Sequence, residues 1–257
     1  MSESDRRTAL LISGGGSTAQ AVIEACQSGE LRGIVPVAVI ASSPTAGGLE
    51  KARALGIETH VVERDRALPK EAFGDKLLEL LQKLDVDLIS QNGWMPLTPD
   101  PIVEEYAGRI INQHPGPLDP GRGMDFGGKG MYGARVLAAR LAYVWATGTD
   151  ESWTEATTHF VTPRYDEGDL IRVARLDIPQ LDRPMAMASI GVGLWGHYTS
   201  LQPQLLPLEH ENVIATLNMF GSGDVEGYRR ETPLVPAEHE MTLNDAKALA
   251  IQIFPNG

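Results

Sequence analysis

Apolar residues recur at two different spacings along the first half of the chain. Short apolar runs predict strands at residues 8–13, 35–40, 59–62, 87–90 and 109–112. Apolar residues three and four positions apart predict intervening helices at about residues 17–26, 47–55, 71–84 and 100–106. This alternation with short links is typical of a parallel sheet that carries helices on both faces. Right-handed crossovers then give a Rossmann-like α/β fold, in which ligands bind at the carboxyl ends of the strands.

The second half of the chain has a different pattern. A loop rich in Gly, Pro and Asp opens it at residues 115–130. A helix is expected after Pro184, which suits a first helical turn, whereas the chain beyond Glu209 is expected to be irregular. The other predicted elements are a helix at about 132–145, an antiparallel pair of edge strands at 154–161 and 170–178, and a final short helix at 243–253.

Composition and charge narrow the class of protein. The chain has 257 residues, of which 42% are hydrophobic and 22% charged, as in an ordinary globular protein. Its formal net charge of -12 argues against a general nucleic-acid surface, and its apolar runs are too short to cross a bilayer. The N-terminal residues lack the apolar core of a signal peptide, and the single cysteine, Cys26, fits the reducing cytosol. We therefore expect a cytoplasmic protein in which an anionic ligand needs a local pocket.

A glycine-rich loop lies between the first predicted strand and the first predicted helix. It reads Gly14-Gly15-Gly16-Ser17-Thr18. Glycines allow close approach to the backbone, and the N–H groups at a helix start attract an anion, to which the two hydroxyl groups would add donors. A dinucleotide site would also need an acidic residue at the end of the second strand, and the chain has none there. The loop therefore suits a phosphate monoester better than NAD, and a tight turn without a ligand is the alternative.

An Asn-x-His motif closes the fifth predicted strand. Asn112 and His114 are two residues apart, so they lie on the same side of an extended chain. A carboxamide and an imidazole can both donate to an oxyanion that develops on a carbonyl, and the imidazole can also move a proton. Asp166, in an acidic turn, is the candidate carboxylate to hold that imidazole. A strand end with an ordinary satisfied histidine is the alternative, and His159 is expected to be packed rather than catalytic.

Four segments resemble the glycinamide ribonucleotide formyltransferases of purine synthesis. In similar order and spacing to that family, they read LISGGGSTAQ, AGGLEKARALGI, VDLISQNGWMPLTPDPIVEEYAGRIINQHPGPLDP and THFVTPRYDEGDLI. The resemblance covers roughly residues 8–180, and the run from Asp87 to Pro120 is its most specific part. It implies a Rossmann-like formyltransferase fold, 10-formyltetrahydrofolate as co-substrate and the amine of glycinamide ribonucleotide as acceptor.

The resemblance also implies roles for particular residues. The catalytic residues of the family fall on Asn112, His114 and Asp166. The substrate-phosphate loop falls on Gly15, Gly16, Ser17 and Thr18. The folate-binding positions fall on Met95, Pro96, Leu97, Thr98, Thr162, Pro163, Arg164 and Tyr165. Lys70 matches an arginine on the folate side and offers a point charge instead of a planar fork.

The chain departs from that family in two places within the resembling region and its flank. The glycine-rich residues 121–130 are extra, and they form either a flexible surface excursion or a lid in which Arg122 or Lys129 grips an anion. The late helix has Leu194-Trp195-Gly196-His197 where the family has a glutamate beside a histidine, which leaves the acceptor amine open. His197 is expected to belong to the core.

Residues 209–257 match nothing in the family. We therefore expect a formyltransferase domain at residues 1–208 and a C-terminal extension at 209–257, packed on the domain or at a dimer interface. The expected partners are a small phosphorylated amine and a reduced folate, with no nucleic acid and no membrane, in a monomer or homodimer. No histidine, cysteine or acidic cluster has the spacing of metal ligands, so no metal is expected. A formyltetrahydrofolate hydrolase, a formyltransferase for a different amine and a catalytically silent sensor are the alternatives.

Overall fold

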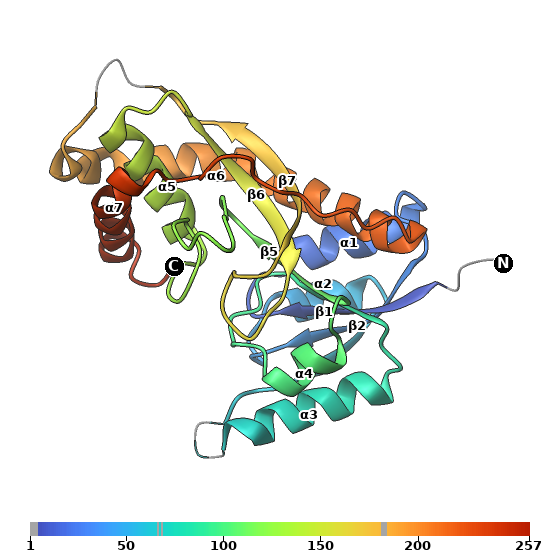
Figure 1. The fold of residues 1–257 in the computed structure, drawn as a ribbon. Helices are drawn as coiled ribbons and strands as arrows, with labels where there is room; N and C mark the ends of the chain where they lie inside the picture. The colour runs from blue at the N-terminus through green and yellow to red at the C-terminus, as the bar shows by residue number, and fades with distance from the viewer. Residues whose placement is uncertain (1–4, 66, 68, 181–183) are drawn as a thin grey trace. The chain divides into compact units, whose positions relative to one another are not determined.

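The computed structural model describes residues 5–65, 67, 69–180 and 184–257 (Figure 1). The strands are β1 (Arg6–Ile12), β2 (Ile34–Ala41), β3 (Glu58–Val61), β4 (Leu88–Gln91), β5 (Ile110–His114), β6 (Trp153–Phe160) and β7 (Leu170–Asp177). The helices are α1 (Ser17–Ser28), α2 (Gly48–Ala54), α3 (Lys70–Lys83), α4 (Asp100–Glu105), α5 (Ala134–Thr147), α6 (Met187–Ser222), the short 3₁₀ helix η1 (Ala237–His239) and α7 (Glu240–Ile253). The strands form one sheet in the order β3-β2-β1-β4-β5-β6-β7. The first five strands are parallel, and β6 and β7 run in opposite directions, so the predicted α/β fold with an antiparallel edge pair is confirmed.

The chain divides into two compact units. The first unit comprises the chain up to Gln113 together with Thr158–Arg164 and Val213–Glu226. The second unit comprises His114–Thr157, Tyr165–Asn212 and Gly227–Gly257. The predicted boundary after residue 208 lies inside α6, and the division into residues 1–208 and 209–257 stays a prediction.

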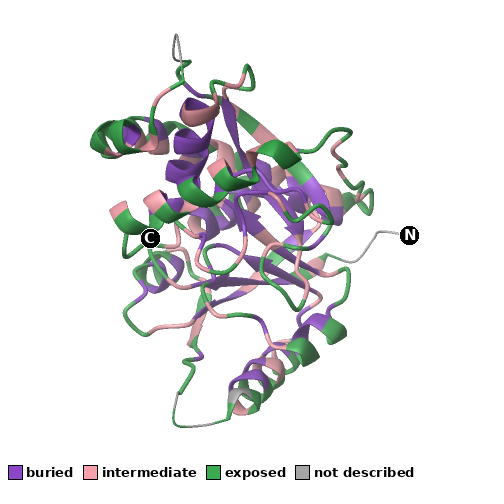
Figure 2. Cartoon of the chain, turned by 60° about the vertical axis from the view of Figure 1, so that its left-hand side comes forward, coloured by how far each residue is buried: buried purple, intermediate pink, exposed green. Residues whose placement is uncertain are grey.

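The first unit is built around its five parallel strands. Alternate residues of a strand point to opposite faces of a sheet. Ala9 and Leu11 of β1 accordingly pack with Leu77 of α3 and Ile102 of α4. On the other face, the side chain of Ile12 points to the start of α2. The central strands are buried along most of their length, so the functional groups of this unit must lie at the strand ends (Figure 2).

The second unit has an apolar core centred on α5. Every residue of α5 from Ala134 to Trp145 is buried, including the charged Arg140. The Arg140 guanidinium donates hydrogen bonds to the carbonyl oxygens of Trp153 (2.7 Å) and Glu151 (3.1 Å), and it lies 4.5 Å from the centre of the Trp153 ring. Burial lowers the pKa of Arg140 to about 10, so the group stays charged at neutral pH. Carbonyl dipoles and aromatic faces thus stabilise a cation inside this core.

Helix α6 is longer than the sequence predicts. The expectation of irregular chain from residue 209 is wrong, because the helix continues to Ser222. Both of its prolines, Pro203 and Pro207, are exposed and lie four residues apart on one face, where water can replace the missing backbone bonds. An apolar stripe along the helix is buried at Leu201, Leu205, Val213, Leu217 and Phe220. Burial of this stripe outweighs the local cost of the two prolines.

The close approach of α1 and α2 provides a stability test. A Cβ atom at Gly48 would lie 2.5 Å from Ile12 Cδ1 and 2.9 Å from the Cα atom of Gly16, whereas one at Gly47 would meet nothing within 4 Å. We expect Gly48→Ala to reduce the free energy of unfolding by about 1–3 kcal/mol through overpacking. We expect the control Gly47→Ala to change it by less than about 1 kcal/mol. Urea unfolding of both variants measures this, and equal effects would contradict the packing described.

Candidate active site

Three candidate segments of the first unit meet at the carboxyl edge of its parallel sheet. The glycine loop follows β1, the segment that contains Met95 follows β4, and Asn112 lies near the end of β5. Leu11 of β1 is paired with Gln91 of β4, and Gln91 is paired with Asn112. The backbone N–H of Met95 also donates to Ser13 Oγ at 2.8 Å, which ties two of these loops together. The edge is the expected position for ligands in such a sheet.

The glycine loop opens α1 with unpaired first-turn donors. Gly16 adopts the left-handed conformation (φ 63°), and a Cβ atom there would lie 2.7 Å from the Cα of Gly48, so only glycine fits. No side chain caps this helix start. The N–H groups at Ser17 and Thr18 can therefore bind an anion, with Gly15 exposed beside them.

The segment after β4 presents apolar side chains on a fixed backbone. Met95 and Leu97 are 43% and 42% exposed, although their side chains are large and hydrophobic. Behind them, Gln91 Nε2 donates to Thr98 Oγ1 at 2.6 Å, and the Trp94 ring stacks on Phe73. Pro96 lies half-buried between the two exposed residues. Exposed apolar side chains of this kind can cover the face of a flat ring.

Asn112 is held by a histidine that sequence analysis assigned to packing alone. His159 of β6 is buried, and its Nδ1 atom lies 2.8 Å from the carbonyl oxygen of Phe160, which can only accept a hydrogen bond. Nδ1 therefore carries a proton, and in the neutral ring Nε2 can accept from Asn112 Nδ2 at 3.1 Å. This bond fixes which end of the Asn112 amide faces His159. The expectation of a purely packed His159 is thus incomplete, because a contact across strands has no signal in residue spacing.

His114 and Asp166 lie side by side in the second unit. His114 Nδ1 is 3.6 Å from Asp166 Oδ1, and their side chains are only 4% and 10% exposed. The backbone N–H of Gly128 donates to Asp166 Oδ2 at 2.9 Å, and His114 Nε2 lies 3.3 Å from the carbonyl oxygen of Phe126. The Asp166 carboxylate and the Phe126 carbonyl oxygen are both acceptors, so each can take a hydrogen bond from a ring N–H of His114. Asp166 itself has a left-handed backbone (φ 59°), which an aspartate tolerates better than most residues.

The glycine-rich loop is anchored at its centre, and its expected role as a lid stays a prediction. Asp125, Phe126 and Gly127 are buried, so this part is not a surface excursion. Arg122, expected as a grip for an anion, is bound to Asp119 at 2.9 Å. The Asp119 carboxylate also accepts from the backbone N–H of Leu234 at 2.8 Å. The loop is therefore fastened to the C-terminal segment.

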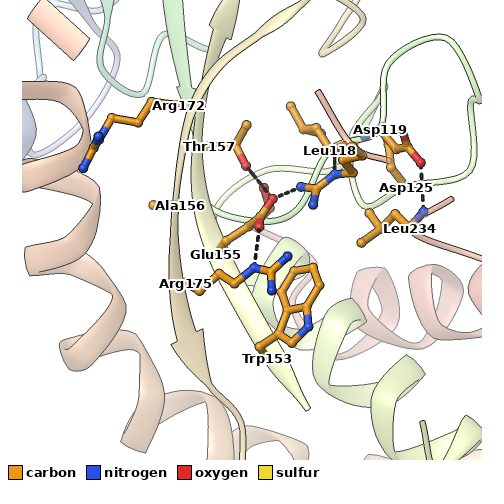
Figure 3. A network of polar contacts seen from close by, with 12 residues as sticks. Leu118, Asp119, Asp125, Trp153, Glu155, Ala156, Thr157, Arg172, Arg175 and Leu234 are labelled. Atoms are coloured by element: carbon orange, nitrogen blue, oxygen red, sulfur yellow. Dashed lines mark hydrogen bonds and ion pairs between the residues drawn. The ribbon is translucent and has the colours of Figure 1, made fainter. Parts of the chain in front are cut away.

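The buried carboxylate of Glu155 contributes to this anchoring (Figure 3). Glu155 of β6 is fully buried and pairs with the guanidinium of Arg230, while Arg175 lies 3.9 Å away. Arg230 in turn donates to the carbonyl oxygen of Leu118 at 2.6 Å. Burial lowers the pKa of Arg230, and the negative charges of Asp119 and Asp125 raise it. Arg230, in the C-terminal segment, is therefore attracted by two carboxylates of the glycine-rich loop and its flank.

Other predicted site residues lie on the turn before Asp166 and on α3. Pro163, Arg164 and Tyr165 are exposed, and Thr162 Oγ1 donates to the Arg164 carbonyl oxygen at 3.1 Å. Lys70 is the first residue of α3, and its side chain lies outside what the structure describes. His197 is exposed on α6 with its ring against Trp145, so its assignment to the core is wrong.

The described residues also include a single cysteine, Cys26. Burial raises the pKa of the Cys26 thiol to about 11, which makes it a poor nucleophile at neutral pH. Within residues 5–65, 67, 69–180 and 184–257, no group of three His, Cys, Asp or Glu side chains is placed to hold a metal ion. Across those same residues, no helix combines the length and apolar character needed to span a membrane.

Comparisons with known proteins show the family of the chain. Residues 6–189 match the family described as formyl transferase. The chain is 30% identical to the chloroplastic phosphoribosylglycinamide formyltransferase of Arabidopsis thaliana over 71% of this chain and 59% of that protein. It is 31% identical to the phosphoribosylglycinamide formyltransferase of Escherichia coli K12 over 66% of this chain and 72% of that protein. The crystal structure of phosphoribosylglycinamide formyltransferase from Brucella melitensis matches with 30% identity and a TM-score of 0.65, over 87% of this chain and 99% of that one.

The Asn112–His159 contact specifies a tautomer that can be measured. We expect the neutral imidazole of His159 to carry its proton on Nδ1 and to accept from the Asn112 amide at Nε2. Ring ¹⁵N chemical shifts, assigned by comparison with His159→Gln, report the two nitrogens separately. A protonated Nε2 would require the amide of Asn112 to be reversed and would contradict this arrangement.

Proposed function

The chain belongs to the formyl transferase family, and we propose that it transfers the formyl group of 10-formyltetrahydrofolate to the amine of glycinamide ribonucleotide. The observation that carries this proposal is the buried pair of His114 and Asp166, with 3.6 Å between Nδ1 and Oδ1, at the end of the strand that bears Asn112. Formyl transfer needs donors for an oxyanion and a group that moves a proton. This strand end supplies both.

The reaction proposed is attack of the acceptor amine on the formyl carbon. A carbon–nitrogen bond forms to the amine, and the carbonyl oxygen of the formyl group becomes an oxyanion. Asn112 has two amide N–H groups, of which one is directed to His159, and the other is suited to the oxyanion. The imidazolium of His114 is the second donor. Its charge is stabilised by the Asp166 carboxylate.

Collapse of the tetrahedral intermediate releases the folate. The bond between the formyl carbon and N10 breaks, and N10 takes up the proton that the attacking amine has lost. His114, or a water held by Asp166, carries this proton, so the enzyme ends the cycle in its starting protonation state. The products are the formylated amine and tetrahydrofolate.

The substrates are assigned to the loops by their chemistry. The phosphate of the acceptor is proposed to bind the helix start at Gly15, Gly16, Ser17 and Thr18, where first-turn N–H groups lack a side-chain cap. The folate is proposed to bind Met95, Pro96, Leu97, Thr98, Thr162, Pro163, Arg164, Tyr165 and Lys70. Exposed apolar side chains on the Met95 segment support a flat ring there. A cytoplasmic monomer or homodimer completes the proposal, and the single free cysteine is consistent with the reducing cytosol.

Acceptor dependence tests the proposed reaction. We expect 10-formyltetrahydrofolate to be consumed rapidly with glycinamide ribonucleotide and to be stable without it, followed by absorbance of the folate and by mass spectrometry of the acceptor. Loss of the formyl group without any amine would identify a hydrolase. Loss of the formyl group that depends on a different amine would reassign the acceptor. Other amines are worth testing because Leu194–His197 contains no glutamate. No loss with any amine would leave a silent binding protein.

Substitutions at the strand end test the roles of its two donors. We expect Asn112→Ala and His114→Ala each to lower kcat about 10²–10³-fold, equivalent to about 3–4 kcal/mol, because each removes one donor to the oxyanion. Gln113→Met is the matched control, since Gln113 is a buried neighbour on the other side of β5. It should keep kcat within a few-fold. Wild-type turnover in either alanine variant would remove that residue from the chemistry.

A further inference from the structure

Three consecutive residues of the glycine-rich loop contact the His114–Asp166 pair. The carbonyl oxygen of Phe126 faces His114 Nε2 at 3.3 Å, and the N–H of Gly128 donates to Asp166 Oδ2 at 2.9 Å. A Cβ atom at Gly127 would lie 2.8 Å from the Cβ of Asp166, so the turn can approach the aspartate only because this residue is glycine. The position of the turn therefore decides the position of the Asp166 carboxylate.

A lysine of the C-terminal helix α7 binds the backbone of the Gly127–Gly128 turn. Lys247 of α7 donates from Nζ to the carbonyl oxygen of Gly127 at 3.0 Å. Asp125 Oδ1 accepts from the N–H of Gly127 at 2.9 Å, so both backbone polar groups of this glycine are bound. Lys247 lies 58 residues beyond the end of the matched family segment at residue 189. The support for the turn thus comes from a part of the chain outside that segment.

The ammonium group also acts on the carboxylates electrostatically. Burial lowers the pKa of Lys247, while the negative charges of Asp125 and Asp166 raise it. Because Coulomb attraction is mutual, the ammonium favours the ionised form of Asp166 by the same interaction. Other charged groups near the turn include His114, which faces Asp166, and Arg230, whose pKa is lowered by burial and raised by the negative charges of Asp119 and Asp125. Arg135 of α5 directs its guanidinium to the carbonyl oxygens of Gly130, Phe254 and Pro255.

We propose that Lys247 is a positioning residue, which holds the Gly127–Gly128 turn under Asp166 and keeps that carboxylate charged for its work on His114. The inference rests on the proposed function, and it makes α7 a part of the active site. Lys247 acts through the turn and through its charge, without contact to the reacting atoms.

Three substitutions separate the hydrogen bond of Lys247 from its charge. Lys247→Arg keeps both, Lys247→Gln keeps an N–H donor for the Gly127 carbonyl and removes the charge, and Lys247→Met removes both. Asp245→Asn is the control, because it changes a charge at an exposed position on the same helix. Thermal unfolding of each variant verifies that it is folded at the assay temperature. If Lys247→Met is unfolded there, the comparison uses Lys247→Gln alone.

The readout is the pH dependence of kcat for formyl transfer, measured with KM. Loss of the positive charge makes Asp166 easier to protonate, so the acidic limb should move to higher pH by about one unit in Lys247→Gln and Lys247→Met. It should stay in place in Lys247→Arg and Asp245→Asn. Loss of the turn anchor should lower the kcat of Lys247→Met about tenfold further, with KM little changed. An acidic limb at the same pH in all variants would overturn the proposal, even if kcat fell equally at every pH.

A second measurement does not depend on activity. Removal of a nearby cation takes away its repulsion of the His114 imidazolium, so the midpoint of the His114 titration by NMR should rise in Lys247→Gln and stay unchanged in Lys247→Arg. If the wild-type protein transfers no formyl group, the proposed function fails, and this titration still decides whether Lys247 acts on the pair. Identical midpoints in the wild type and in Lys247→Gln would overturn the inference.

Discussion

Burial of the Asp166 carboxylate beside His114 is the constraint that organises the second unit. A carboxylate that is only 10% exposed loses most of its hydration, and an uncompensated charge there would be strongly destabilising. The N–H of Gly128 donates to one carboxylate oxygen, and the imidazole of His114 lies 3.6 Å from the other, so both offset that cost. The loop must therefore bring its backbone against the aspartate. That requirement explains why Gly127, with no Cβ, stands at the contact.

The same requirement extends to the C-terminal segment. A loop rich in glycine has a large conformational entropy to lose, so its ordered backbone needs contacts from several directions. Lys247 binds the carbonyl oxygen of Gly127, Arg230 binds that of Leu118, and the N–H of Leu234 binds Asp119. These contacts come from residues beyond the segment that matches the family model, so a part of the chain outside that segment supports residues within it.

The first unit exposes polar groups at the end of a buried sheet. Its strands are too buried to carry function along their length, and the loops at their carboxyl ends carry it instead. Close packing of Gly16 on Gly48 sets the start of α1 and leaves its first N–H groups uncapped. The bond between Asn112 and His159 fixes the direction of an amide that could otherwise face either way. Rigid backbone and oriented dipoles are what a preorganised site requires.

Local periodicity in the sequence was sufficient to determine the order of strands and helices, the glycine loop, and the strand end with Asn112 and His114, because these depend on neighbours two to four residues apart. Asp166 was proposed as the partner of His114 from its acidic turn and from a family motif, and the structure places the two side chains 3.6 Å apart. The continuation of α6 past Pro203 and Pro207, the anchoring of the loop by Arg230 and Lys247, and the contact of His159 with Asn112 were decided only by the tertiary structure. Each of these joins residues far apart in the chain or depends on which face is buried, and packing in three dimensions decides such contacts.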